Sequence, residues 1–93
     1  MYNSNNIMKT YFNRILKDSK EIVVPGNVYK HYKGGIYKVI GVAMHTEQMY
    51  PIVVYRNINE QQLWARPYNM FIDYTDTNLK RFELLKNNKK NNV

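Results

Sequence analysis

Cysteine is absent from this sequence of 93 residues, so neither a disulfide bond nor a thiolate metal site can stabilise the fold. A chain of this length forms one domain with a small core. No apolar run reaches the roughly 20 residues that a membrane-spanning helix needs. Residues 1–6 also lack the charged and then apolar plan of a signal peptide. We therefore expect a cytoplasmic protein with no membrane association.

Side chains with catalytic or metal-binding chemistry are sparse. The two serines, Ser4 and Ser19, lie near the N-terminus, far in sequence from His31 and His45, and there is no Gly-x-Ser-x-Gly or Walker-type loop. A zinc site needs three or four ligands, and the two histidines with Glu47 supply three candidates without a fourth. His45 and Glu47 could form an acid–base pair, but their segment reads as a strand end that enters a turn. We expect no catalysis, no metal and no cofactor.

The excess of positive charge, +7 in all, lies mostly at the two ends of the chain. Residues 1–20 carry four basic side chains and one acid, a net charge of +3, and residues 87–93 carry two lysines. The region 21–86 carries eight basic and six acidic side chains, a net charge of only +2. Such a distribution indicates solubility and non-specific attraction to anions before it indicates a nucleic-acid site.

Residues 5–18 have the pattern of an amphipathic helix. The apolar residues follow spacings of one and three, which place them in a single stripe on a helix of 3.6 residues per turn. These residues are Ile7, Met8, Tyr11, Phe12, Ile15 and Leu16. The stripe either docks on the rest of the domain or contacts a second copy or a partner protein through Ile7, Tyr11, Phe12 and Ile15. The sequence leaves both alternatives open.

From residue 21 onward, short runs of β-branched and aromatic residues alternate with turn residues. The runs that predict strands are 22–24, 28–32, 36–45, 51–56, 62–66 and 81–85. Residues 25–27 and 33–35 predict turns, Gly41 predicts a bulge or bend, and 67–71 predict a tight turn or one helical turn. Residues 87–93 have little apolar content to bury and predict a disordered basic tail.

These elements describe a mainly β protein in which five or six short antiparallel strands form a small, strongly bent barrel or sheet. We expect an N-terminal amphipathic helix over 1–20, the β domain over 21–86 and the tail over 87–93.

The strand region also resembles a bacterial family known only as domain of unknown function 1653. The matching stretches are Pro25-Gly26, residues 29–39, Gly41-Val42-Ala43, His45-Thr46-Glu47, residues 53–56, residues 63–67, Met70-Phe71 and Arg81-Phe82. The sequence departs from the family pattern at Thr46, Ala65 and Lys80, where the family usually has Ser, Val and Pro. The resemblance implies a small SH3-like barrel and no particular activity.

Aromatic and basic side chains gather on two of the predicted strands. Tyr29, His31 and Lys33 alternate onto one face of the first, and Trp64 and Arg66 do the same on the second. Rings and cations on one concave surface suit a flat anionic ligand, because a ring stacks on a base while cations hold phosphate. The same side chains could also simply fill the ends of a small barrel.

Further residues complete the predicted site. Tyr32, Tyr37, Tyr55 and Arg56 add rings and a guanidinium, whereas Leu63 and Ala65 read as core residues. The predicted ligand-binding residues are His31, Tyr32, Lys33, Gly34, His45, Arg56, Trp64 and Arg66.

The balance of charge favours a compact ligand. A nucleic acid needs several phosphate contacts along a track, and the nearly neutral region 21–86 offers few. A nucleotide or a nucleotide-derived signal needs two or three cations and one stacking ring. We therefore expect a non-catalytic binding module for an anionic, nucleotide-like small molecule, which it would sense or sequester. Binding of single-stranded RNA or DNA is the first alternative, and docking of a protein through the helix is the second.

Overall fold

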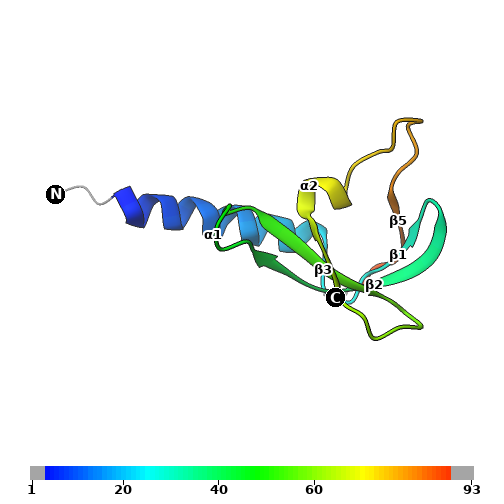
Figure 1. Ribbon diagram of the computed structural model, residues 1–93. Helices are drawn as coiled ribbons and strands as arrows, with labels where there is room; N and C mark the ends of the chain where they lie inside the picture. The colour runs from blue at the N-terminus through cyan, green and yellow to red at the C-terminus, as the bar shows by residue number, and fades with distance from the viewer. Residues whose placement is uncertain (1–3, 89–93) are drawn as a thin grey trace, which may run out of the picture.

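The computed structural model describes residues 4–88, with side chains from Lys9 to Asn88. Two helices and five strands follow one another along the chain (Figure 1). They are α1 (Ser4–Ile22), β1 (Val28–His31), β2 (Gly34–Met44), β3 (Pro51–Asn57), β4 (Trp64–Pro67), α2 (Tyr68–Phe71) and β5 (Phe82–Lys86). The prediction of a mainly β protein with an N-terminal helix is confirmed, and residues 67–71 contain the single helical turn that the sequence indicated.

The five strands form one antiparallel sheet in the order β4-β3-β2-β1-β5. The pairing of β2 with β3 shifts register between Val39 and Gly41, where the sequence predicted a bulge or bend. Long strands that bend in this way curl the sheet around its concave face. Within residues 4–88 the edge strands β4 and β5 do not pair with each other, so the sheet remains open instead of closing into a barrel.

The core fills the concave side of this bent sheet. Its buried members are Val23, Tyr29, Val39, Val42, Val53, Phe71 and Phe82. The rings of Phe71 and Phe82 stack with 4.1 Å between centroids and 10° between planes. Phe71 also meets Tyr29 and Tyr55 edge to face, at 5.1 and 5.4 Å. Side chains, and not strand hydrogen bonds, therefore connect the two edges of the sheet.

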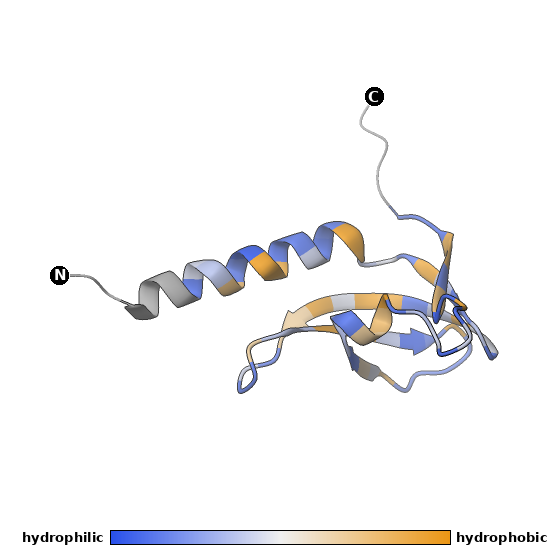
Figure 2. Cartoon of the chain, turned by 90° about the horizontal axis from the view of Figure 1, so that it is seen from above, coloured by the Kyte–Doolittle hydropathy of each residue, from blue (hydrophilic) through white to orange (hydrophobic). Residues whose placement is uncertain are grey.

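Helix α1 lies against β2 and β3 with only part of its length, and its first half extends past the sheet (Figure 2). Leu16 packs against the core, and the buried Ser19 hydroxyl donates to the carbonyl of Ile15 at 2.8 Å. The predicted strand 22–24 is wrong, because Ile22 ends the helix and the Val23 N–H still donates to the Ser19 carbonyl at 2.9 Å. Among the described residues, no helix has the length and hydropathy required to cross a membrane.

The junction between α1 and β1 contains Asn27, whose side chain is only 1% exposed. Its Oδ1 accepts a hydrogen bond from the Asn88 main-chain N–H at 2.8 Å, and its Nδ2 donates to the Tyr29 hydroxyl at 3.3 Å. The Asn88 side chain in turn donates to the Pro25 carbonyl at 3.0 Å. Asn88, the second residue of the predicted tail, is thus bonded to this junction, and residues 89–93 lie outside the described part of the chain.

Replacing Phe71 by alanine should lower the free energy of unfolding by about 3–5 kcal/mol, the usual cost of removing a buried phenyl ring. That is a large part of the ~5–15 kcal/mol that stabilises a typical domain. Equilibrium unfolding in urea, followed by circular dichroism, measures the change. Leu85→Ala is the control, because Leu85 is 52% exposed on β5. Equal losses from the two variants would contradict the assignment of Phe71 to the core.

Candidate functional site

A hollow of about 100 Å³ opens where the two edges of the sheet face each other. All five strands contribute to it. Its lining residues are His31 from β1, Tyr37 from β2, Tyr55 from β3, Trp64 and Arg66 from β4, and Phe82 from β5. The hollow thus exists only because the bent sheet brings its first and last members together.

Strand register explains why these side chains share one face. Residues directly opposite each other in antiparallel strands point to the same side of a sheet. Trp64 lies opposite Tyr55, and Phe82 lies opposite His31. The His31 and Phe82 rings are 4.9 Å apart, and the Tyr55 and Phe82 rings are 5.4 Å apart. The edge strand β4 therefore supplies a ring and a cation to the hollow, and the neighbouring strands β1 and β5 supply His31 and Phe82 on its other side.

The two β4 residues in the hollow differ in how firmly they are held. Arg66 donates from Nε to the Met70 carbonyl at 2.9 Å, and its guanidinium lies near the Tyr55 hydroxyl. Burial raises the pKa of Tyr55, and the charge of Arg66 partly offsets that rise. Trp64 is 51% exposed, so one side of its indole is available to solvent. The site thus combines an oriented cation with an exposed flat ring.

His31 is the polar group at the opposite side of the hollow. Its Nδ1 accepts the Lys33 main-chain N–H at 3.2 Å, so the proton of the neutral ring sits on Nε2 as a donor. Partial burial lowers the pKa of His31, and the positive charges of Arg66, Arg81 and Lys33 lower it further. Arg81 is itself paired with Asp73 at 2.6 Å, so Arg66 and Lys33 are the unpaired cations near this ring.

The β1–β2 turn next to the hollow carries three more of the predicted residues. Tyr32 has two cations over its ring, with Lys33 Nζ at 5.6 Å and Arg81 Cζ at 5.7 Å from the centroid. Gly34 has a φ of +107°, a conformation that glycine adopts without strain, so the turn itself explains this residue. A second hollow of about 220 Å³ adjoins the turn, and it is lined by Lys30, His31, Tyr32, Leu79, Lys80 and Glu83.

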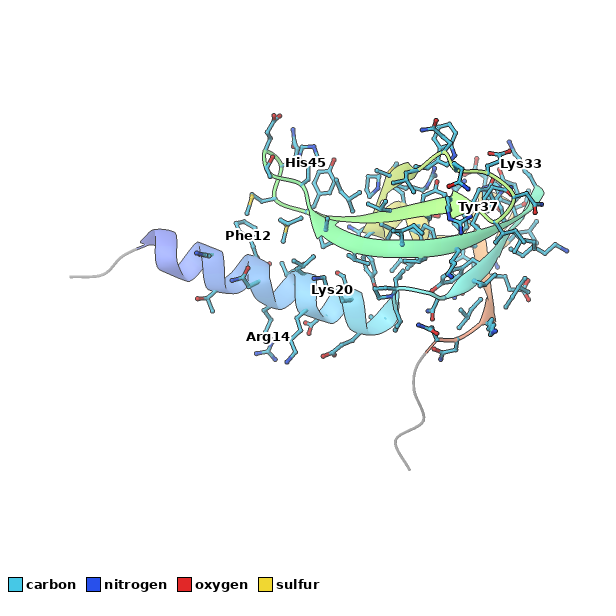
Figure 3. The ribbon with its side chains drawn as sticks, turned by 90° about the horizontal axis from the view of Figure 1, so that it is seen from below. Phe12, Arg14, Lys20, Lys33, Tyr37 and His45 are labelled. Atoms are coloured by element: carbon cyan, nitrogen blue, oxygen red, sulfur yellow. The ribbon has the colours of Figure 1, made fainter. Side chains whose placement is uncertain are left out.

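His45 does not belong to this site. It follows β2 at the end remote from the β1–β2 turn, and Figure 3 shows His45 and Lys33 at opposite ends of the sheet. Its ring stacks on Tyr50 at 5.0 Å, and its Nδ1 accepts the main-chain N–H groups of Glu47 and Gln48 at 3.2 and 3.0 Å. The side chain completes the β2–β3 turn, which is its structural role.

Arg56 is also placed away from the hollow. Its Nη1 donates to the main-chain carbonyls of Asn57, Ile58 and Glu60, each at 3.3 Å. These bonds hold the β3–β4 loop in place. Among the predicted residues, His31, Trp64 and Arg66 therefore line the hollow, Tyr32, Lys33 and Gly34 form the adjoining turn, and His45 and Arg56 serve other turns.

Sequence reasoning missed Phe82 as a lining residue, and it wrongly assigned Leu63, which precedes β4, and Ala65 in β4. Leu63 and Ala65, predicted as core, are exposed, because β4 is an edge strand whose outer face nothing covers. Phe82 could be found only from its pairing with His31, which links residues distant in sequence. Within residues 9–88, no three histidine, aspartate or glutamate side chains come together in a way that could hold a metal ion.

The structure defines a small β domain in which a strongly bent, open antiparallel sheet is joined to an N-terminal helix. The chain belongs to the family described as "Protein of unknown function (DUF1653)", whose model matches residues 27–84, more than half of the sequence. Comparison with curated proteins and with solved structures found no match. The matched segment contains every residue that lines the hollow, whereas α1 lies outside it.

The electrostatics of the hollow can be measured through the His31 ring. We expect its pKa to lie below the ordinary value of 6.5, and Arg66→Gln should raise it because one of the nearby positive charges is removed. Titration of the histidine ring protons by NMR gives both values. Lys38→Gln is the control, since Lys38 is exposed and is not among the charges that act on His31. A His31 pKa that does not respond to Arg66→Gln would contradict the geometry.

Proposed function

We propose that this protein is a non-catalytic binding module for a phosphate-bearing aromatic ligand of the nucleotide type. One observation carries the proposal: an exposed tryptophan ring, an arginine and a histidine line the same small hollow, and the positive charges of Arg66 and Lys33 lie near that histidine. Stacking on an aromatic ring and charge-assisted hydrogen bonds are the two interactions that hold such ligands. A cytoplasmic location, where free nucleotides are abundant, is part of the same proposal.

The size of the hollow limits how the ligand is held. Sites that enclose a whole small molecule usually measure about 300–1,000 Å³, whereas this hollow measures about 100 Å³. It therefore takes a single phosphate group, between the Arg66 guanidinium and the His31 Nε2–H. The base then lies outside, on the exposed face of Trp64.

The lining chemistry favours binding over catalysis. Among the described residues, the hollow contains no carboxylate and no serine or threonine hydroxyl, so an acid–base pair of the usual kind is not supplied. The tyrosine hydroxyl of Tyr55 has a raised pKa, which keeps it protonated near neutral pH. Such a site can hold an anion without reacting with it.

A longer single-stranded nucleic acid is the second candidate, and one observation favours it. The hollow at the β1–β2 turn also contains His31, and Lys30 and Lys80 line it. Further phosphates could contact these lysines. The carboxylate of Glu83 in the same hollow opposes such a contact, so we place the compact ligand first.

Binding can be followed by the fluorescence of Trp64, which is the single tryptophan of the chain. Mononucleotides, dinucleotides and short single-stranded oligonucleotides are titrated at low and at high salt. We expect a mononucleotide to quench the fluorescence and to retain its affinity when salt is raised. A signal that only oligonucleotides produce, and that salt abolishes, would favour the nucleic-acid alternative.

Variants then test the assigned residues by isothermal titration calorimetry. Trp64→Ala and Arg66→Gln should each weaken binding about tenfold or more, because a stacked base contributes ~1–3 kcal/mol and a charged hydrogen bond ~1.5–3 kcal/mol. Leu63→Ala is the matched control, since Leu63 precedes Trp64 and is equally exposed at 50% but lies outside the hollow. Unchanged affinity in both site variants would refute the proposal.

A further inference from the structure

Helix α1 exposes an apolar flank beside the surface that docks on the sheet. Tyr11 is 59% exposed and Ile22 is 63% exposed. Together with Ile15 and Asp18 they follow spacings of four, three and four, which place all four on one side of a helix. Figure 3 shows that Phe12 points toward the sheet, whereas Arg14 points away from it. The flank therefore runs along the helix between its packed side and its solvent side.

This flank borders an apolar groove. Two hollows of about 350 and 380 Å³ adjoin there, because Tyr50, Pro51, Tyr68 and Asn69 line both of them. Ile22 lines the first of the two. Each is larger than either of the two hollows that His31 lines. The groove lies at the end of the sheet where β3 starts and β4 ends, so it is separate from the proposed ligand site.

The charges of the groove are unusual for a protein of net charge +7. Asp18 is the one charged residue among the described residues that line it. Within residues 9–88, the one ion pair is Arg81 with Asp73, so neither Asp18 nor the exposed Arg14 is in an ion pair of its own chain. An occupant that complements the groove needs an apolar stripe with a cation on its edge. The flank of α1 itself has these properties, with Tyr11 and Ile15 as the stripe and Arg14 beside it.

We propose that the occupant is a second copy of this chain, whose α1 lies antiparallel along the same flank. In a twofold-symmetric dimer one surface patch meets its own copy, so a contact between two residues occurs twice. Arg14 precedes Asp18 by one helical turn, on the same edge of the flank. When two such helices run antiparallel, Arg14 of each copy meets Asp18 of the other. Tyr11 of each copy then reaches the partner's hollow beside Ile22, since the helix extends past its own sheet.

The positive net charge of each copy does not prevent this arrangement. At physiological ionic strength, charges farther apart than about 8 Å are largely screened from each other. The two proposed Arg14–Asp18 contacts lie within that distance, and Asp18 is the one charged side chain of the described residues that lines the groove. Screening thus leaves the short-range contacts at the flank as the main electrostatic interactions of the proposed dimer.

Charge-reversal variants of the full chain test the proposal by complementation. The wild type should sediment as a monomer–dimer equilibrium. Arg14→Asp places like charges at both contacts, and Asp18→Arg does the same with the opposite sign. Each variant should therefore dimerise about tenfold or more weakly than the wild type. An equimolar mixture of the two should form a heterodimer, because each reversed charge then meets an opposite one.

Sedimentation velocity measures the extent of dimerisation in the wild type, in each variant and in the mixture. Circular dichroism checks that the exposed substitutions leave the helix intact. Restored dimerisation in the mixture alone supports the proposal. A wild type that stays monomeric at the highest accessible concentration overturns it, and so do single variants that dimerise as well as the wild type. Nucleotide binding read from Trp64 is independent of these outcomes, so a failure here and a failure of the proposed function are distinguishable.

Discussion

Phe71 and Phe82 stack with 4.1 Å between their centroids, although one follows the edge strand β4 and the other begins the edge strand β5. No strand pairing joins these edges within residues 4–88. The packing of the two rings therefore holds the edges together, as hydrogen bonds between strands do in a closed barrel. The contact sets how near β4 comes to β1 and β5. It therefore sets the width of the hollow between Arg66 and His31, and with it the size of the group that can enter.

Local patterns in the sequence were sufficient for most of the fold. The stripe of apolar residues gave the helix, the turn residues separated the strands, and Gly41 marked the place where β2 changes register. The error at Ile22 has a physical cause: β-branched residues favour strands, but here the helix continues so that Val23 enters the core at 1% exposure. The packing of Val23 in the core thus determines where the helix ends, and the strand propensity of residues 22–24 carries no information on that packing.

The candidate site could be predicted only in part, for a related reason. Alternation along β4 correctly placed Trp64 and Arg66 on one face, because that inference needs only the strand period. His45 and Arg56 lie away from the hollow, because a titratable or charged side chain is equally suited to satisfying main-chain groups in a turn. The residue type alone does not distinguish a ligand-binding side chain from one that stabilises a turn. The hydrogen-bond partners do distinguish these two roles, but they depend on the conformation of the loop.

The pairing of Asn27 with Asn88 gives the order of chain synthesis a structural meaning. The two residues are 61 positions apart, yet the Asn88 N–H is the group that satisfies the buried Oδ1 of Asn27. A buried acceptor without a donor costs about 1–3 kcal/mol. While the chain is being made, both helices and all five strands are therefore synthesised before the junction between α1 and β1 can reach its final state. The earliest part of the fold is finished by one of its last residues.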